Sequence, residues 1–365
     1  MTKVLCINNG YPSNRYPNYT TYIKSIEDCL TCAGIEVEHI VISYNRQILI
    51  PYKLLKYVTF WINLYSVQLY NYDYIYINHP PFSWPIFFNR TFENERVVLH
   101  WHGNDVVGKG IIQTLFSKLL KSKCREMKSI VPSLYFKSVV EDKLKIPANQ
   151  IVVSPSGGVD TELFCPIPKQ IKDSNTIVLG YASGMSRCKG ANTIMWLVDH
   201  CKEIEANLSC KILFHIIDTG SEIEMYREKL LASPNVVLIS KMPKCEMPAY
   251  YNNLDVLLMS SNISESLGLV VLDALRCGKP AICFNLFAFP EFVIPGKTGE
   301  LVDYSLCEEE NCRGFIKAIV RCLLNKEKYS TRDIIMNSYS KATVINQYKN
   351  IFKYVNNDCY GENLL

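Results

Sequence analysis

Short apolar runs recur along the chain, and each is followed by a polar loop and a segment in which apolar residues have helical spacing. In the first half, these runs predict strands at residues 3–8, 37–42, 74–78, 97–100, 129–132 and 151–154. In the second half, they predict strands at residues 177–181, 211–217, 236–239, 256–260 and 280–284. Strands that alternate with helices are typical of parallel sheets. The pattern therefore predicts an α/β protein.

The length of the chain predicts two domains. A chain of 365 residues exceeds what one ordinary hydrophobic core supports. Pro166-Ile-Pro168 and the polar stretch that ends at Asn175 resemble an interdomain linker. We expect Rossmann-like domains over residues 1–165 and 166–337.

Composition favours a packed globular protein, because 48% of the residues are hydrophobic and 20% are charged. The 15 cysteines are scattered, which favours reduced thiols and a cytoplasmic location. Cys29 and Cys32 share a predicted helix and are interpreted as packing residues rather than metal ligands. No apolar run reaches the roughly 20 residues that span a bilayer. Residues 1–8 predict a strand rather than a signal peptide.

The formal net charge of +4 comes from the first half of the chain. Residues 116–128 predict a basic helix in which lysines and an arginine surround Leu119 and Leu120. Such a helix can lie on an anionic membrane surface, but an ordinary solvated helix has the same pattern, so both interpretations stay open. Nucleic acid is less favoured, because no recognisable binding motif is present.

Two acidic residues mark the most informative segment, residues 264–302. The spacing predicts a helix that Ser264 caps, that Gly278 and Pro280 end, and that carries both Glu265 and Asp273. On one helix these acids would be about 12 Å apart with about 80° of rotation, so both would face one cleft. Carboxylates at that separation suit a ligand with hydroxyl pairs at both ends, such as a nucleotide sugar. The alternative is a surface helix with solvated acids.

This segment resembles the retaining nucleotide-sugar-dependent glycosyltransferases of family four (glycosyl transferases group 1). The match comprises Glu265-Ser-Leu-Gly268, Asp273 with the residues up to Pro280, Pro290-Glu291 and Pro295-Gly-Lys-Thr-Gly299. The chain departs from the family pattern in two places: Asp273 replaces a glutamate, and Phe287 and Ala288 replace a glycine pair. The resemblance implies a GT-B fold, in which two Rossmann-like parallel-sheet domains face each other across a cleft. It also implies that residues 338–365 contain a final helix that packs back on the first domain.

Further motifs extend the resemblance. Residues 153–164 resemble the segment that leaves the first domain, where Gly157 and Gly158 allow unusual backbone angles and Asp160 is interpreted as a turn residue. Lys189-Gly190 resembles the family's Lys-Gly, which holds the donor diphosphate. An ammonium group suits this position, because negative charge develops on the leaving diphosphate. The family's arginine is replaced by Gly184, and Arg187 is expected to take its place.

On the acceptor side, His102-Gly-Asn-Asp105 resembles a family motif whose histidine reaches the donor sugar. We expect His100 to point to the opposite face of its strand. The loop after the first strand retains Gly10 near the family's glycine-rich turn. Its aromatic and basic side chains are expected to hold the acceptor.

The resemblance assigns roles to individual residues. The expected catalytic residues are His102, Lys189 and Glu265. The expected donor-binding residues are Gly10, Arg187, Lys189, Gly190, Glu265, Ser266, Leu267, Gly268, Asp273, Ala288 and Phe289, where the amides of residues 288–291 complete the sugar pocket. The expected acceptor-binding residues are Arg15, Tyr16, Tyr19 and Asp105.

The sequence thus predicts a retaining glycosyltransferase that uses a UDP-sugar in preference to a GDP-sugar. The expected acceptor is a saccharide or a lipid-linked saccharide of bacterial surface polysaccharide or glycolipid synthesis. No Asp-x-Asp pair and no G-x-G-x-x-G motif is present, so neither a metal nor a nicotinamide cofactor is expected. The expected location is cytoplasmic, with peripheral contact to the inner face of the plasma membrane. Two alternatives stay open: a non-catalytic GT-B binding protein and a sugar-nucleotide epimerase.

Overall fold

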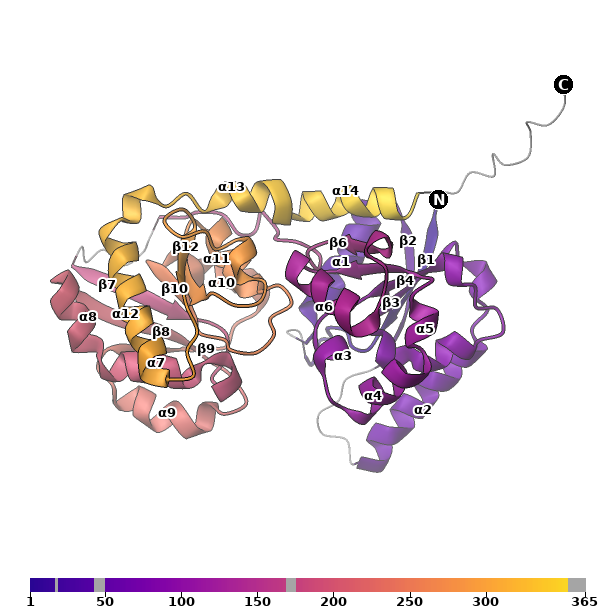
Figure 1. Ribbon diagram of the computed structural model, residues 1–365, viewed down its shortest axis with the longest axis horizontal. Helices are drawn as coiled ribbons and strands as arrows, with labels where there is room; N and C mark the ends of the chain where they lie inside the picture. Colours follow the sequence, from indigo (N-terminus) through magenta and orange to yellow (C-terminus); the bar gives the residue numbers. More distant parts are fainter. Residues whose placement is uncertain (17–18, 43–49, 169–174, 354–365) are drawn as a thin grey trace, which may run out of the picture. The chain divides into compact units, whose positions relative to one another are not determined.

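The computed structural model describes residues 1–16, 19–42, 50–168 and 175–353. The chain forms two compact units (Figure 1). Unit 1 contains Met1–Val131, Val139–Gly158 and the segment from Ala342 onwards, and unit 2 contains Pro132–Ser138 and Val159–Lys341. The predicted linker crosses residues 169–174, which lie outside the described residues.

Unit 1 is built on a parallel sheet of six strands in the order β2-β1-β3-β4-β5-β6. The strands are β1 (Lys3–Asn8), β2 (Glu36–Val41), β3 (Tyr74–Asn78), β4 (Val97–His100), β5 (Lys128–Val131) and β6 (Ile151–Val153). The main helices are α1 (Thr21–Cys32), α2 (Ile50–Ser66), η2 (Pro80–Phe88), α3 (Asn104–Val107), α4 (Ile111–Leu119), α5 (Lys121–Cys124) and α14 (Lys341–Ile351). Helix α6 (Leu134–Leu144) begins with residues of unit 2 and ends in unit 1. The three-residue helices η1 (Leu69–Asn71), η3 (Asn94–Arg96) and η4 (Ala148–Gln150) connect them.

The inner strands β1, β3, β4 and β5 of this sheet are mostly buried, which explains their nearly continuous apolar sequences. Helix α14 joins α1 on one face, where Val344 and Tyr348 pack in the same core as Tyr76 of β3. The hydroxyl groups of Tyr76 and Tyr348 are 3.2 Å apart. The π-helix η9 (Ile335–Tyr339), which precedes α14 in the chain, belongs to unit 2.

Unit 2 has a second parallel sheet of six strands, in the order β12-β11-β10-β7-β8-β9. The strands are β7 (Thr176–Tyr181), β8 (Lys211–Asp218), β9 (Val236–Ser240), β10 (Val256–Met259), β11 (Ala281–Phe284) and β12 (Gly299–Val302). The helices are η5 (Arg187–Lys189), α7 (Ala191–Asp199), α8 (Cys201–Leu208), α9 (Ile223–Ala232), η6 (Lys244–Glu246), α10 (Met247–Asn252), α11 (Leu269–Arg276), η7 (Phe289–Glu291), α12 (Glu308–Leu324), η8 (Lys326–Lys328) and α13 (Arg332–Ile334). Helices α7, α8, α9 and α12 share one core cluster, and α10 and α11 share the other.

The strand predictions are confirmed within one residue at each end. Strand β12 was not predicted, although its segment was recognised by its Pro295-Gly-Lys-Thr-Gly299 turn. The prediction of one basic helix over residues 116–128 is wrong. Helix α4 ends at Leu119, α5 covers only Lys121–Cys124, and β5 already begins at Lys128.

Candidate functional site

The strand order reverses between β1 and β3 in unit 1 and between β7 and β10 in unit 2. In open α/β sheets, ligands bind outside the carboxyl ends of the strands at such a point. The loop after β7 carries Lys189, and the loop after β10 carries Glu265. The topology therefore brings two predicted site residues of unit 2 to the same edge of its sheet.

Lys189 and Glu265 form an ion pair between the lysine Nζ and the carboxylate Oε1. Their side chains are 28% and 15% exposed, so both remain accessible to a ligand. Ser261 donates a hydrogen bond of 2.8 Å to the same Oε1 atom. The arrangement places one cation and one carboxylate side by side at the carboxyl ends of the strands of unit 2.

Gly190 holds the two loops of this edge together. Its φ of +82° lies in the left-handed region, and a Cβ atom there would be 1.9 Å from the carbonyl oxygen of Ser260. The Ser260 hydroxyl donates a hydrogen bond of 2.9 Å to the carbonyl of Gly190. Only glycine permits this approach, which fixes the position of the neighbouring Lys189.

The prediction that Glu265 and Asp273 share one helix is wrong. Helix α11 begins at Leu269 after Gly268, whose φ is +94°, so Ser266, Leu267 and Glu265 lie in the preceding loop. Leu267 is buried in the core, and a Cβ atom on Gly268 would be 2.8 Å from the ring of Phe289. Ser264, the expected cap, instead has its hydroxyl 2.9 Å from that of Tyr135.

Asp273 lies on α11 in a different environment from Glu265. The residue is buried, and its Oδ1 atom has no hydrogen-bond partner among the described residues. Burial raises the pKa of this carboxyl to about 6, and the charge of Asp160 adds to this effect while Lys244 opposes it. An unsatisfied buried acceptor is costly, so this carboxyl group destabilises the fold when it is ionised.

The predicted amide donors of residues 288–291 are largely used inside the protein. Ala288 and Phe289 are buried, and the amides of Phe289 and Glu291 donate to the carbonyls of Leu286 and Ala288. The Glu291 carboxylate accepts hydrogen bonds from the amides of residues 134 (3.0 Å) and 135 (2.6 Å), at the start of α6. The amides of Phe289 and Glu291 are thus engaged within unit 2, and their expected role in the sugar pocket stays a prediction.

Phe287 adopts a φ of +59°, although it is not a glycine. This is one of the two positions where the family pattern has glycine. Its ring lies 5.7 Å from the ring of Tyr135, whose hydroxyl contacts Ser264 beside Glu265. The glycine-like backbone is thus retained, with an aromatic side chain added to it.

Arg187 and Gly184 occupy the rest of the β7 loop. Arg187 is exposed, and its amide donates a hydrogen bond of 2.9 Å to Glu222. Arg187 and Gly190 line a cavity of about 170 Å³, which Lys189 and Glu265 do not line. Gly184 has a φ of +83° and packs against Gly220.

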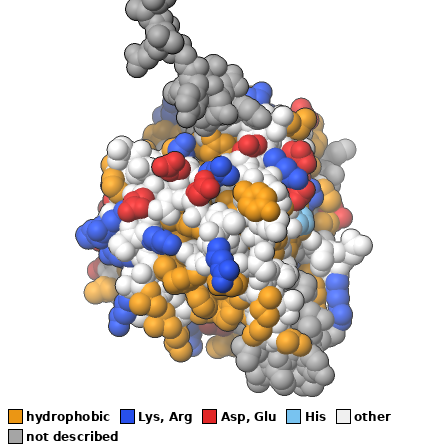
Figure 2. All heavy atoms as spheres, turned by 90° about the vertical axis from the view of Figure 1, so that its right-hand side faces the viewer, with side chains coloured by type: hydrophobic (Ala, Val, Ile, Leu, Met, Phe, Trp, Pro, Cys, Tyr) orange, Lys and Arg blue, Asp and Glu red, His pale blue; other side chains and the backbone are white. Residues whose placement is uncertain are grey.

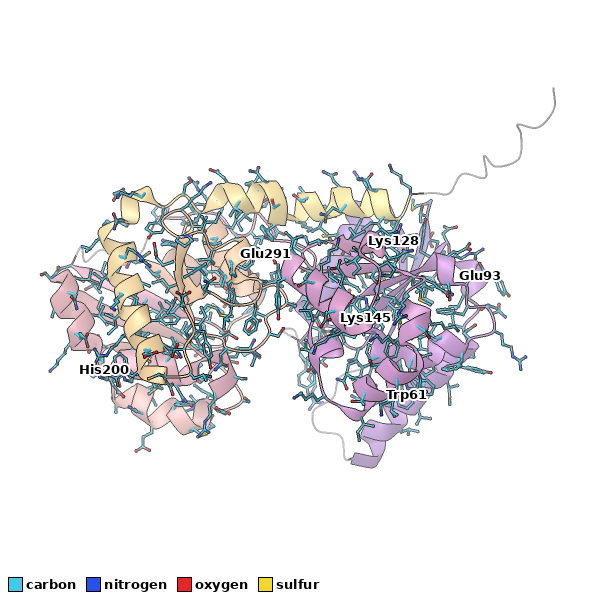
Figure 3. The ribbon with its side chains drawn as sticks, viewed as in Figure 1. Trp61, Glu93, Lys128, Lys145, His200 and Glu291 are labelled. Carbon is cyan, nitrogen blue, oxygen red and sulfur yellow. The ribbon has the colours of Figure 1, made fainter. Side chains whose placement is uncertain are left out.

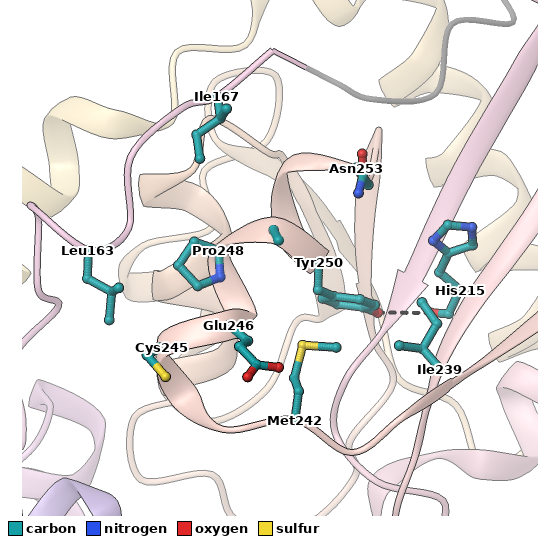
Figure 4. Close-up of a pocket in the computed structure, with 11 residues that line it drawn as sticks. Leu163, Ile167, His215, Ile239, Met242, Cys245, Glu246, Pro248, Tyr250 and Asn253 are labelled. Atoms are coloured by element: carbon teal, nitrogen blue, oxygen red, sulfur yellow. Dashed lines mark hydrogen bonds between the residues drawn. The ribbon is translucent and has the colours of Figure 1, made fainter.

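A second cavity of unit 2, of about 610 Å³, contains none of the predicted site residues (Figure 4). It is mainly apolar, and Leu163, Met242 and Ile239 contribute to its lining. The Tyr250 hydroxyl donates a hydrogen bond of 2.9 Å to the carbonyl of His215 at one wall.

In unit 1, a chain of polar side chains crosses the point where the strand order reverses. His102 Nε2 donates to Asn78 Oδ1 at 2.8 Å, because the amide oxygen can only accept. Asn78 donates to Asn8 at 2.8 Å, and Asn8 donates to the buried Glu27 at 2.6 Å. The network fixes the tautomer of His102 and links β1 to β3.

Asp105 organises the loop that follows β4. Its carboxylate accepts hydrogen bonds from the amides of His102 and Gly103, and it lies 3.5 Å from Nδ1 of His79. The Nε2 atom of His79 is 2.7 Å from the Tyr22 hydroxyl. Asp105 therefore positions the two histidines, while its side chain is fully covered.

The prediction that His100 points away from His102 is wrong. Their ring centroids are 4.0 Å apart, because residues two apart in an extended chain lie on the same face. Burial lowers the pKa of His100 to about 3 and that of His102 well below its usual range. Both rings are neutral at physiological pH.

The loop after β1 keeps the predicted acceptor residues near one another. Tyr16 pairs with Ser13 through backbone hydrogen bonds, and the amide of Tyr19 donates to the carbonyl of Tyr16. The guanidinium of Arg15 lies 5.8 Å from the Tyr16 ring. A Cβ atom on the buried Gly10 would be 2.6 Å from the Tyr19 ring. Residues 17 and 18 lie outside the described residues.

Sequence reasoning missed several residues at the carboxyl ends of the strands in the two units. They are Asn8, Tyr22, Asn78, His79, Tyr135 and Ser261. A signal was present for two of them, because Asn8 and Asn78 are the polar last residues of otherwise apolar strands. Tyr22 comes three residues after the predicted Tyr19, whereas Tyr135 lies far from the motifs in sequence and only the fold brings it to the site.

Part of the chain is similar to a known protein family. Residues 167–334 match the family model described as Glycosyl transferases group 1. That match covers most of unit 2, including Lys189, Glu265 and Asp273.

Two bacterial proteins are similar to parts of the chain. The chain is 22% identical over 245 residues to lipopolysaccharide 1,2-N-acetylglucosaminetransferase of Salmonella typhimurium, covering 62% of each chain. It is 32% identical over 143 residues to an uncharacterized 41.2 kDa protein in the cps region of Klebsiella pneumoniae, covering 39% of this chain and 38% of the relative. The alignments thus span between 38% and 62% of the lengths of these relatives.

Solved structures show the fold over nearly the whole chain. Sucrose-phosphate synthase from Thermosynechococcus elongatus aligns with a TM-score of 0.72 and 17% identity, covering 96% of this chain and 98% of that chain. HepE from Anabaena, solved with UDP and glucose, aligns with a TM-score of 0.69 and 16% identity, covering 96% and 99%. The predicted fold class is confirmed: each unit has the parallel sheet of a GT-B protein.

Proposed function

We propose that this protein transfers a sugar from a nucleotide sugar to a saccharide or lipid-linked saccharide acceptor. The observation that carries the proposal is the Lys189–Glu265 pair, at the edge of unit 2 where its strand order reverses. A nucleotide sugar presents a diphosphate to the cation and hydroxyl groups to the carboxylate. The match of residues 167–334 to glycosyl transferases group 1 supports this assignment.

In this proposal, Lys189 leaves Glu265 when the donor binds and neutralises the diphosphate. The first amides of α11, which follow Gly268, add positive partial charge near the same loop. Glu265 then accepts hydrogen bonds from the sugar, and Asp273 accepts one from the ribose. The charge of Lys189 stabilises the leaving phosphate as the glycosidic bond breaks.

We further propose retention at the anomeric carbon, with front-face attack and transfer of the acceptor proton to the leaving phosphate. This step requires no nucleophilic side chain and no metal ion. We assign the acceptor to unit 1, to Arg15, Tyr16 and Tyr19 of the loop after β1 and to Asp105, and neutral His102 contributes a hydrogen bond to the donor sugar. UDP-sugars are favoured, since the structural neighbours include proteins solved with UDP and with UDP-glucose.

A non-catalytic binding protein is the second candidate. It is favoured by the buried Asp273, which is shorter than the glutamate of the family pattern and leaves Oδ1 unsatisfied. Such a protein would bind the nucleotide sugar without turning it over.

The test is a donor screen with the purified full chain, in which binding of UDP- and GDP-sugars is measured by calorimetry and release of nucleoside diphosphate is measured separately. Binding and release with an acceptor extract, both lost in Lys189→Ala, support a transferase. Lys202→Ala, an exposed lysine on α8, is the matched control. Binding without release identifies the non-catalytic candidate, and absence of binding to every donor rejects both. Retention is tested by the anomeric configuration of the product in NMR spectra.

A further inference from the structure

Unit 1 exposes a group of large apolar side chains on α2, η2 and α4. They are Leu55, Val58, Ile62 and Tyr65 of α2, Trp84 and Phe88 of η2, and Ile111, Leu115 and Leu119 of α4. We call these residues the apolar surface. Figure 2 views the molecule from the right-hand side of Figure 1 and shows hydrophobic side chains gathered low on this face, with Lys and Arg side chains beside them.

Three apolar residues of α4 are exposed and share one face of the helix. Ile111, Leu115 and Leu119 recur every four residues, which places them on one face of the helix. They are 79%, 52% and 71% exposed, whereas Phe116 between them is buried. Helix α4 therefore packs on the unit through Phe116 and presents its aliphatic stripe to the surroundings.

Aromatic contacts join α2 to η2. The Trp61 ring lies 6.0 Å from Tyr57 and 5.6 Å from Trp84, and Trp84 lies 6.0 Å from Phe88. Trp61 also donates a hydrogen bond of 3.1 Å to the carbonyl of Phe82. Figure 3 labels Trp61 on this part of unit 1. The aromatic side chains form one connected row rather than isolated exposed residues.

The charged side chains of the elements that carry the apolar surface, and of the adjacent α5, are all positive. The sequence of α2, η2, α4 and α5 contains five lysines and no aspartate or glutamate. Lys123 of α5 donates a hydrogen bond of 2.7 Å to the carbonyl of Phe87, and its Nζ lies 5.2 Å from the Phe92 ring. This contact ties the basic α5 to the aromatic η2.

We propose that the apolar surface binds the surface of an anionic lipid bilayer, with α2, η2 and α4 lying in the headgroup region. Aliphatic residues enter the acyl boundary, tryptophan and tyrosine occupy the interface, and lysines meet the lipid phosphates. The cores of protein interfaces are depleted of lysine, whereas here lysines lie on the same elements as the apolar residues. A bilayer supplies both an apolar phase and dense negative charge. No helix among the described residues is long and apolar enough to cross a membrane.

The experiment is sedimentation of the full-length protein with sucrose-loaded vesicles. One set contains phosphatidylcholine alone, and the other contains phosphatidylcholine with phosphatidylglycerol. We expect at least roughly tenfold stronger binding to the anionic set, and weaker binding as salt shortens the Debye length from about 10 Å to about 3 Å. Equal binding to both sets, or none to either, overturns the proposal.

Variants locate the contact. Ile111→Ser with Leu119→Ser tests the apolar stripe, and its matched control is Leu231→Ser with Leu306→Ser, whose residues are exposed in unit 2. We expect a roughly tenfold loss of vesicle binding in the first pair and no loss in the second. Because these side chains are exposed, thermal melts of all variants should match the wild type.

Charge variants test the contribution of the lysines to vesicle binding. Lys118→Gln with Lys121→Gln should weaken binding to anionic vesicles roughly fivefold per lysine. Lys202→Gln with Lys317→Gln in unit 2 is the control and should have no effect. A wild-type dimer in gel filtration that the α4 variant dissociates, without vesicle binding, would assign the surface to a second copy of the chain and reject the lipid. The assay needs no donor, so its failure is separate from that of the proposed function.

Discussion

The Lys189 ammonium group contacts the Glu265 carboxylate at the point where the sheet of unit 2 reverses its strand order. Each charge is therefore engaged by the other before a ligand arrives. A diphosphate must compete with Glu265 for the cation, and sugar hydroxyls must compete with Lys189 for the carboxylate. The pair keeps two opposite charges positioned at a partly buried edge without leaving either one unpaired.

This competition predicts that Glu265→Gln binds UDP more tightly than the wild type does. The substitution removes the negative charge and releases Lys189 for the diphosphate. A partly exposed ion pair contributes about 1 kcal/mol, which corresponds to an affinity gain of roughly fivefold. Calorimetric titration with UDP measures it, and sugar transfer should be lost because the hydroxyl acceptor is weakened.

Lys189→Ala is the complementary variant. Loss of a charge-assisted contact to phosphate should reduce UDP affinity by about tenfold or more. The exposed Lys202→Ala should titrate like the wild type. If Glu265→Gln lowered UDP affinity as much as Lys189→Ala does, the two side chains would not be competing in the way proposed.

The buried Asp273 predicts an unusual dependence of stability on pH. Its pKa of about 6 lies above the ordinary value of 3.8, so the folded chain takes up this proton more readily than the unfolded chain does. The protonated Asp273 carboxyl adds to the free energy of unfolding near pH 4, and this contribution is lost as the pH rises through 6. The difference of about two between these pKa values corresponds to roughly 3 kcal/mol in the free energy of unfolding. Asp273→Asn should therefore be more stable than the wild type at pH 8, with little difference near pH 4.

Urea-induced unfolding at the two pH values measures this effect. Asp142→Asn is the control, because Asp142 is exposed and the pKa of its carboxyl is lowered by Lys145. That variant should gain no stability at pH 8. A pH-independent difference for Asp273→Asn would mean that the carboxyl ionises with an ordinary pKa.

Most strands were predictable because they lie inside covered parallel sheets and are apolar runs bounded by polar loops. Strand β2, with the sequence EVEHIV at the edge of its sheet, is an exception. The Lys189–Gly190 and Glu265 motifs were also visible, and the fold brings Lys189 and Glu265 into contact. The helix boundary at Gly268 was not predicted. Its backbone is left-handed and the Phe289 ring lies close to it, neither of which helical periodicity reveals.

The network of polar side chains in unit 1 was harder to predict, because its residues come from segments that are distant in sequence. Tyr22 lies on α1 and Asn78 ends β3, while His102 follows β4. The position of His100 beside His102 followed from strand geometry and was misjudged. Strand periodicity, applied correctly, places residues two apart on one face.

Asn78 predicts a stability effect in unit 1, since it accepts from His102 and donates to Asn8 in a buried network. Asn78→Leu removes both of these hydrogen bonds, at about 1–3 kcal/mol each. We expect a loss of roughly 2–6 kcal/mol in urea-induced unfolding. Asn14→Leu, at an exposed position, should cost little. Equal costs at the two positions would show that the network contributes no net stability.

Phe287 predicts an inversion of the usual preference between alanine and glycine. Its φ of +59° is unfavourable for residues with a Cβ atom, so Phe287→Gly should be more stable than Phe287→Ala by about 1 kcal/mol. Both variants lose the contact with Tyr135, so the comparison isolates the backbone term. Met225, which is exposed on α9, provides the opposite case, and Met225→Gly should be less stable than Met225→Ala by about 1 kcal/mol. Urea-induced unfolding of the four variants decides the matter, and the same sign at both positions would contradict a left-handed backbone at Phe287.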